Sequence, residues 1–205
     1  MLSLLKLKRQ ESENMNYFPA YIKMNNQKIL LVGGGKVAFE KLSHLVNFTT
    51  NIAILAKSIN RDVKTLAAQN DINTREKSYC KGDVAFFDIV IVAVDDLSLQ
   101  EDIFQEARGK GILCNAVDSL DYCDFIFPSY IKKGDLIVSV STSGASPAVA
   151  KYLRRYIEKM LPDGIELFLK EMREYRKRLP KGKPRMQFLD KLAKNYFKTK
   201  DERDE

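Results

Sequence analysis

The sequence predicts an α/β protein in which a parallel sheet domain is followed by a β-hairpin segment and a C-terminal helical region. Two observations favour this fold class. Short apolar runs alternate with amphipathic helical patterns up to residue 118, which is typical of a parallel sheet with helical crossovers. Beyond that residue two strand-like runs follow each other directly, and only helical patterns come after them. Within the 205 residues we expect an N-terminal extension over 1–16, the sheet domain over 17–118, the hairpin segment over 119–147 and the helical region over 148–205.

The first strand of the sheet ends in a glycine turn within residues 28–38. The apolar run stops at Gly33, Gly34 and Gly35, and apolar residues then recur at helical spacing. Glycine lets the main chain lie against a ligand with no Cβ in the way, and the helix start offers free N–H groups to a pyrophosphate. Together with Ala38, the first and third glycines fit the G-x-G-x-x-G/A fingerprint of Rossmann-type domains. The turn therefore predicts a bound dinucleotide such as NAD, although such turns also occur without a ligand.

The other sheet elements follow in chain order. We expect strands over 51–56, 72–77, 88–94 and 111–116, a helix over 59–69, and a helix from the Asp95–Asp96 cap to about Arg108. The β-branched run within 88–94 is typical of a strand that is covered on both faces. Ligands of such sheets lie beyond the carboxyl ends of the strands. Besides the glycine turn, the residues at those ends are Lys57, Ser58, Val94, Asp95 and 115–118.

The end of the second strand bears on the choice of dinucleotide. The acidic residue that often binds the adenosine ribose of NAD is absent there, and Lys57 stands in its place. A lysine could tolerate the 2′-phosphate of NADP, so the residues alone leave both cofactors open.

The hairpin consists of strand-like runs at 125–131 and 136–140, joined by a Lys-Lys-Gly-Asp turn. A lone hairpin is marginal in water, so we expect a second copy of the chain to pair with it in a homodimer. Ser146 is placed to cap the next helix, with Pro147 in its first turn. We expect helices over 147–161, 163–179 and 184–198.

The formal net charge of +7 is unevenly distributed, because all of the basic excess lies beyond residue 150. Three interpretations are open: a solvated helical surface, a nucleic-acid-binding tail, or a surface that attracts an anionic small molecule. Few aromatic residues interleave with the charges, which argues against nucleic acid as a partner.

The chain has three cysteines without C-x-x-C spacing, which favours a reducing cytoplasm over a disulfide scaffold or a zinc site. No apolar segment approaches the roughly 20 residues that span a bilayer, so we expect no membrane partner. The one histidine, His44, falls on the polar face of the first helix. We therefore expect no resident metal site.

Three segments together resemble the dehydrogenase/ferrochelatase part of siroheme synthases over about residues 17–162. They are 32–38 with Lys41, 115–118 leading to 124–128, and 141–147, of which the last is the most specific. The resemblance implies oxidation of precorrin-2 to sirohydrochlorin with NAD. It also implies a tetrapyrrole substrate, a homodimer and, in many members, insertion of ferrous ion; a cobaltous ion is a further metal substrate to consider.

The resemblance assigns roles to residues of this chain. It implies cofactor contacts from Gly33, Gly34, Gly35, Lys36, Val37, Lys57, Ser58, Val94 and Asp95, a functional carboxylate at Asp118, and tetrapyrrole contacts from Asn115, Ser141, Thr142 and Ser146. Two residues depart from the family pattern. Ala116 replaces a valine, and Val94 stands where threonine is common, which removes one hydroxyl near the cofactor.

Asp118 is the residue on which the chemistry depends. A carboxylate at a strand end can accept the proton released on dehydrogenation, orient the ring, or merely cap the next turn. We expect a functional role and an NAD-dependent precorrin-2 dehydrogenase. A nucleotide-sensing regulatory domain, which is not an enzyme, is the alternative that shares the glycine turn and the sheet.

Overall fold

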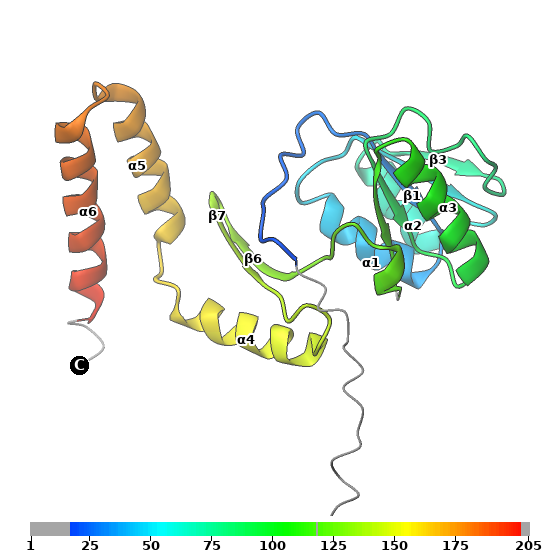
Figure 1. Ribbon diagram of the computed structural model, residues 1–205. Helices are drawn as coiled ribbons and strands as arrows, with labels where there is room; N and C mark the ends of the chain where they lie inside the picture. Colours follow the sequence, from blue (N-terminus) through cyan, green and yellow to red (C-terminus); the bar gives the residue numbers. More distant parts are fainter. Residues whose placement is uncertain (1–16, 118, 202–205) are drawn as a thin grey trace, which may run out of the picture. The chain divides into compact units, whose positions relative to one another are not determined.

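A computed structural model describes residues 17–117 and 119–201, with side chains as far as residue 198. The N-terminal extension expected over 1–16 and the whole of Asp118 lie outside the described residues. The chain divides into two units, which end and begin at Ile126 and Phe127 (Figure 1).

The first unit contains a five-stranded sheet in the order β3-β2-β1-β4-β5, and every neighbouring pair is parallel. Its strands are β1 (Ile29–Val32), β2 (Ile52–Ala56), β3 (Asn73–Glu76), β4 (Ile89–Val92) and β5 (Leu113–Ala116). All residues of β1 and β4 are buried, as their continuous apolar sequences predict. The predicted strands are confirmed, with ends that differ by one or two residues.

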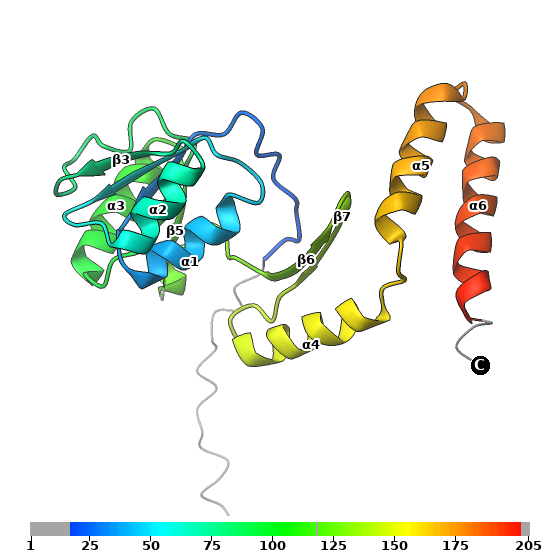
Figure 2. The same ribbon diagram turned by 180° about the vertical axis from the view of Figure 1, so that it is seen from behind.

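Three helices cover the sheet: α1 (Lys36–Leu45), α2 (Arg61–Gln69) and α3 (Leu97–Gly109). Figures 1 and 2, seen from opposite sides, show α3 on one face and α1 with α2 on the other. The chain thus turns to opposite faces after β1 and after β4, which are neighbours. Ligands of open α/β sheets bind in the crevice that this arrangement creates at the carboxyl ends.

Side chains define where the helices begin. Asn60 Oδ1 accepts a hydrogen bond from the N–H of Val63 at 2.8 Å, so α2 begins two residues later than predicted. Asp96 Oδ1 accepts from the N–H of Leu99 at 3.1 Å and caps α3. The cap expected at Asp95–Asp96 is therefore made by the second of the two residues.

Glu106 on α3 anchors the loop that precedes β4. Its carboxylate accepts hydrogen bonds from the Tyr79 hydroxyl at 2.7 Å, the Gly82 N–H at 2.9 Å and the Lys110 ammonium at 2.9 Å. Burial acts to raise the pKa of Glu106, but these three donors outweigh it and the pKa lies below its ordinary value.

The segment after β5 differs from the prediction in two ways. Residues 119–126 belong to the first unit and contain a short 3-10 helix, η1 (Leu120–Tyr122), that the sequence did not reveal. The expected strand over 125–131 is wrong in its first four residues, because β6 begins at Ser129. Phe125 O is instead occupied by the Asn115 amide at 2.8 Å, and Pro128 has no N–H to pair.

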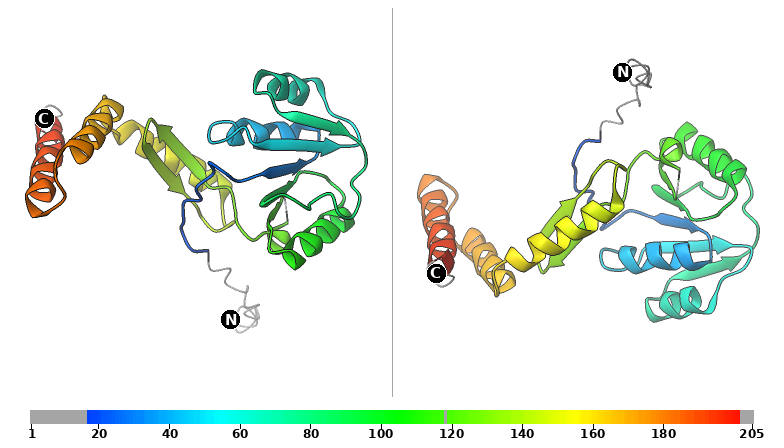
Figure 3. Two further views of the ribbon diagram at one scale, coloured as in Figure 1. Left: turned by 90° about the horizontal axis from the view of Figure 1, so that it is seen from above. Right: turned by 90° about the horizontal axis from the view of Figure 1, so that it is seen from below.

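The second unit consists of a hairpin and three helices. Strands β6 (Ser129–Lys133) and β7 (Leu136–Val140) are antiparallel, and Gly134 adopts a left-handed φ of +56° in their turn. Helix α4 (Pro147–Met160) packs along the hairpin (Figure 3), and α5 (Ile165–Arg178) and α6 (Lys183–Asp201) follow. The three helices agree with the prediction to within three residues.

Candidate dinucleotide site

Two of the three glycines after β1 are required by the packing of the fold. Gly33 has φ of +136°, and a Cβ on it would lie 2.2 Å from Ala93 O. A Cβ on Gly34 would lie 2.2 Å from Ser58 O and 2.8 Å from the Cα of Ile59. Both glycines are buried. Their backbone thus brings the loops that follow β2 and β4 against the end of β1.

Gly35 is different, because a Cβ there would meet no atom of the described residues within 4 Å. It is exposed, with φ of −91° and ψ of −162°, and is the N-cap of α1 without a side-chain cap. The first N–H groups of a helix have no intrahelical partner, and the helix dipole makes this end positive. The backbone around Gly35, Lys36 and Val37 therefore fits a dinucleotide pyrophosphate, since it offers uncapped donors and open space.

The sequence-predicted cofactor residues come together around this turn. The N–H of Asn60 donates to Gly34 O at 2.9 Å, which places the exposed residues Lys57 and Ser58 beside the glycines. Val94 and Asp95 follow Ala93, whose carbonyl packs against Gly33. Contacts between these residues and a cofactor remain predictions.

Asn115 lies at the carboxyl end of β5 and is 5% exposed. Its Nδ2 donates to Phe125 O at 2.8 Å and to Cys123 Sγ at 3.3 Å, while Oδ1 has no partner among the described residues. The side-chain amide of Asn115 thus connects β5 to the segment that follows it. The expected contact with substrate remains a prediction.

Cys123 was not singled out by the sequence, yet its thiol closes the loop that follows β5. Its one S–H proton is shared between two carbonyl acceptors, Ala116 O at 3.0 Å and Ser119 O at 3.1 Å from Sγ. Burial raises the pKa of this thiol, while the charge of Lys41 on α1 acts in the opposite direction. The thiol therefore serves as a hydrogen-bond donor to the backbone on either side of position 118.

The hydroxyl-rich loop between β7 and α4, in the second unit, is ordered by its own side chains. Thr142 Oγ1 accepts from the N–H of Ser146 at 3.1 Å and donates to its carbonyl at 3.0 Å. Ser141 Oγ accepts from the N–H of Ser143 at 3.0 Å, and Ser146 Oγ caps α4 through the N–H of Val149 at 3.3 Å. The Thr142 proton is therefore engaged, whereas these bonds leave the hydroxyl protons of Ser141 and Ser146 available to a ligand.

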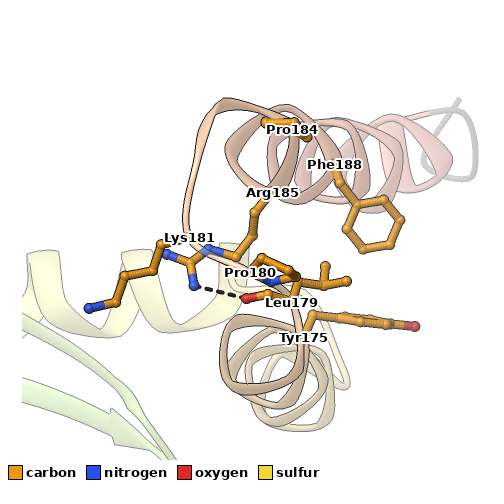
Figure 4. Close-up of a pocket in the computed structure, with 7 residues that line it drawn as sticks. All are labelled: Tyr175, Leu179, Pro180, Lys181, Pro184, Arg185 and Phe188. Carbon is orange, nitrogen blue, oxygen red and sulfur yellow. Dashed lines mark hydrogen bonds between the residues drawn. The ribbon is translucent and has the colours of Figure 1, made fainter.

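A cavity of about 440 Å³ lies at the bend between α5 and α6 (Figure 4). Its walls include Tyr175 and Phe188, whose rings meet edge to face at 5.3 Å. Arg185 donates to Arg176 O at 3.1 Å and to Leu179 O at 3.2 Å, so its charge complements the carboxyl end of α5. The cavity contains none of the predicted site residues.

Within the described part of the chain, no group of three or more His, Cys, Asp or Glu side chains could hold a metal ion. His44 is exposed on α1, as expected. Of the helices described, none is long and apolar enough to cross a membrane.

Comparison with known proteins gives consistent results. A family model described as putative NAD(P)-binding matches residues 20–129. The siroheme synthase of Mannheimia succiniciproducens is 36% identical over 148 residues, which cover 72% of this chain and 31% of that protein. The siroheme synthase of Methylococcus capsulatus is 35% identical over 170 residues, which cover 83% of this chain and 36% of that protein. This chain therefore spans about a third of the length of these relatives.

The solved structure of SirC, precorrin-2 dehydrogenase, has the same fold, with a TM-score of 0.74. The two chains are 19% identical, and the match covers 86% of this chain and 89% of that one. Because the family model covers more than half of the residues, the chain belongs to the putative NAD(P)-binding family, and in sequence it is a homologue of the siroheme synthases.

Proposed function

We propose that this chain is an NAD-dependent precorrin-2 dehydrogenase, which oxidises precorrin-2 to sirohydrochlorin. The observation that carries the proposal is the open helix start at Gly35 in a homologue of siroheme synthases. The similarity in fold to a solved precorrin-2 dehydrogenase supports it.

The oxidation removes a hydride and a proton from the tetrapyrrole. NAD, when bound, supplies the hydride acceptor. The N–H groups of Lys36 and Val37 would bind its pyrophosphate, and Lys57, at the end of β2, would face its adenosine ribose. Asp118 accepts the proton as a carboxylate base, a role for which one well-placed group contributes about 100-fold or more in rate.

The substrate carries several carboxylates, which need donors rather than acceptors. Ser141 and Ser146 retain hydroxyl protons for them, and Thr142 fixes the loop on which both stand. Lys151 and Arg155 follow on α4 and are exposed, so they add positive charge close to this loop in the sequence.

A homodimer is part of the proposal, since the hairpin is a two-stranded sheet that would be marginal alone. Helix α4 supports it with an exposed apolar stripe at spacings of three and four residues, made of Val149, Tyr152, Leu153, Tyr156 and Met160.

A ferrous or cobaltous ion is proposed only as a substrate for insertion into sirohydrochlorin. The proposed location is a reducing cytoplasm, because an exposed free thiol such as that of Cys80 stays reduced there.

The test is incubation of the protein with precorrin-2 and NAD, followed by ferrous or cobaltous ion, with absorbance spectra at each stage. The proposal expects sirohydrochlorin and NADH to appear together, and a metal-dependent change afterwards if insertion occurs. Tight NAD binding without any oxidation would instead support the nucleotide-sensing alternative.

A further inference from the structure

The turn between β4 and α3 is held by a buried amide. Gln100 on α3 is 2% exposed, and its Nε2 donates to the carbonyl of Val94 at 2.6 Å. Its Oε1 is buried and has no hydrogen-bond partner among the described residues. Because a carbonyl can only accept, the bond to Val94 fixes which end of the amide carries the hydrogens.

This amide is not needed to fill the core. Its buried neighbours on the same helix, Ile103, Phe104 and Ala107, are apolar, and a leucine in place of Gln100 would match them. An unpaired buried acceptor costs about 1–3 kcal/mol, and leucine would avoid that cost. The glutamine therefore contributes through the one bond that it makes.

That bond acts on the part of the sheet edge where a dinucleotide is expected. The carbonyl of Ala93 packs against Gly33, and the Val94 carbonyl is fixed by Gln100. Asp96 then caps α3, so exposed Asp95 is held between two anchored residues. The distance between this turn and the glycine turn depends on both anchors.

We propose that Gln100 is a positioning residue for the dinucleotide: through the Val94 carbonyl it sets the place of the β4–α3 turn against which the cofactor lies. The inference rests on the proposed NAD binding. It deepens that proposal by naming a residue that makes no contact with the cofactor and yet determines its affinity.

The experiment is calorimetric titration of the 205-residue chain with NAD, together with thermal unfolding. Gln100→Leu and Gln100→Met both remove the donor but keep a side chain of similar size. Gln105→Leu is the matched control, since Gln105 is exposed on the same helix. Both Gln100 variants should unfold close to the wild-type temperature and bind NAD about fivefold to tenfold more weakly, the scale of one buried hydrogen bond. The control should bind normally.

A second readout separates positioning from a general loss of structure. In steady-state oxidation of precorrin-2, the KM for NAD should rise in the Gln100 variants while the KM for precorrin-2 stays unchanged. Folded Gln100 variants with wild-type NAD affinity would overturn the inference, and so would loss of folding in both. If Gly35→Asp abolishes NAD binding while the Gln100 variants bind normally, the proposed function stands and only this inference fails. A wild-type chain that does not bind NAD would remove both.

Discussion

The Gly35→Asp substitution should separate cofactor binding from folding. Gly35 is exposed, its φ of −91° suits any residue, and no described atom lies within 4 Å of a Cβ placed there. Asp is also among the preferred N-cap residues, differing from Gly by only a few tenths of a kcal/mol. We therefore expect an unfolding free energy within about 0.5 kcal/mol of wild type.

The effect on NAD binding should be large, for two reasons. The new carboxylate would occupy the N–H groups at the start of α1, and it would place a negative charge beside the pyrophosphate. Two like charges about 4 Å apart interact by about 4 kcal/mol at an effective dielectric constant of 20. That corresponds to a loss of affinity of roughly a thousandfold.

The assay is NAD titration by calorimetry on folded protein, with thermal unfolding followed by circular dichroism. Gly34→Ala is the contrasting variant, since its Cβ would lie 2.2 Å from Ser58 O and should cost about 1–3 kcal/mol of stability. Wild-type NAD affinity in Gly35→Asp would refute the placement of the pyrophosphate at α1. Marked unfolding of Gly35→Asp would show that the fold itself requires glycine at this position, and would refute its assignment to ligand binding.

Three further outcomes are expected. Asp118→Ala should slow precorrin-2 oxidation at least about 100-fold in steady-state assays while calorimetry shows normal NAD binding; near-normal turnover would remove this carboxylate from the chemistry. Glu106→Gln should lower stability at pH 7 by about 1–3 kcal/mol. The pKa of Glu106 is depressed below its ordinary value of 4.5, so its contribution to the free energy of unfolding is complete above that pH and is lost as the pH falls through the folded pKa. The free energies of urea unfolding of the wild type and of Glu106→Gln should therefore converge in acid. A difference that stays constant with pH would contradict this. Thr142→Val should loosen the loop before α4 and raise the KM for precorrin-2 severalfold, with the KM for NAD unchanged; an unaltered KM for precorrin-2 would exclude the loop from substrate binding.

The sheet could be predicted because its signals are local. Ile89–Val92 is a buried run of β-branched residues, and the glycine turn marks the end of β1 by composition alone. Helix starts were also predictable, since Ser146 and Asp96 cap the segments that follow them. Each of these features depends on residues within a few positions.

The remaining features depend on contacts between residues far apart in the chain. From the sequence alone the three glycines cannot be distinguished. The close approach of the Ala93 and Ser58 carbonyls shows that Gly33 and Gly34 are required by packing. Gln100 reads as an ordinary polar helix residue until its bond to Val94 is known. The late start of β6 similarly follows from the Asn115 amide, which takes the carbonyl that an earlier strand would have used.

The central claim is that NAD binds at the start of α1 with its nicotinamide beside the carboxylate of Asp118. The most direct measurement is a crystal structure of the 205-residue chain with NAD soaked into the crystal. We expect the pyrophosphate on the N–H groups of Lys36 and Val37, and the nicotinamide and the Asp118 carboxylate facing a common space large enough for a tetrapyrrole. A nicotinamide separated from Asp118 by packed side chains would contradict the account.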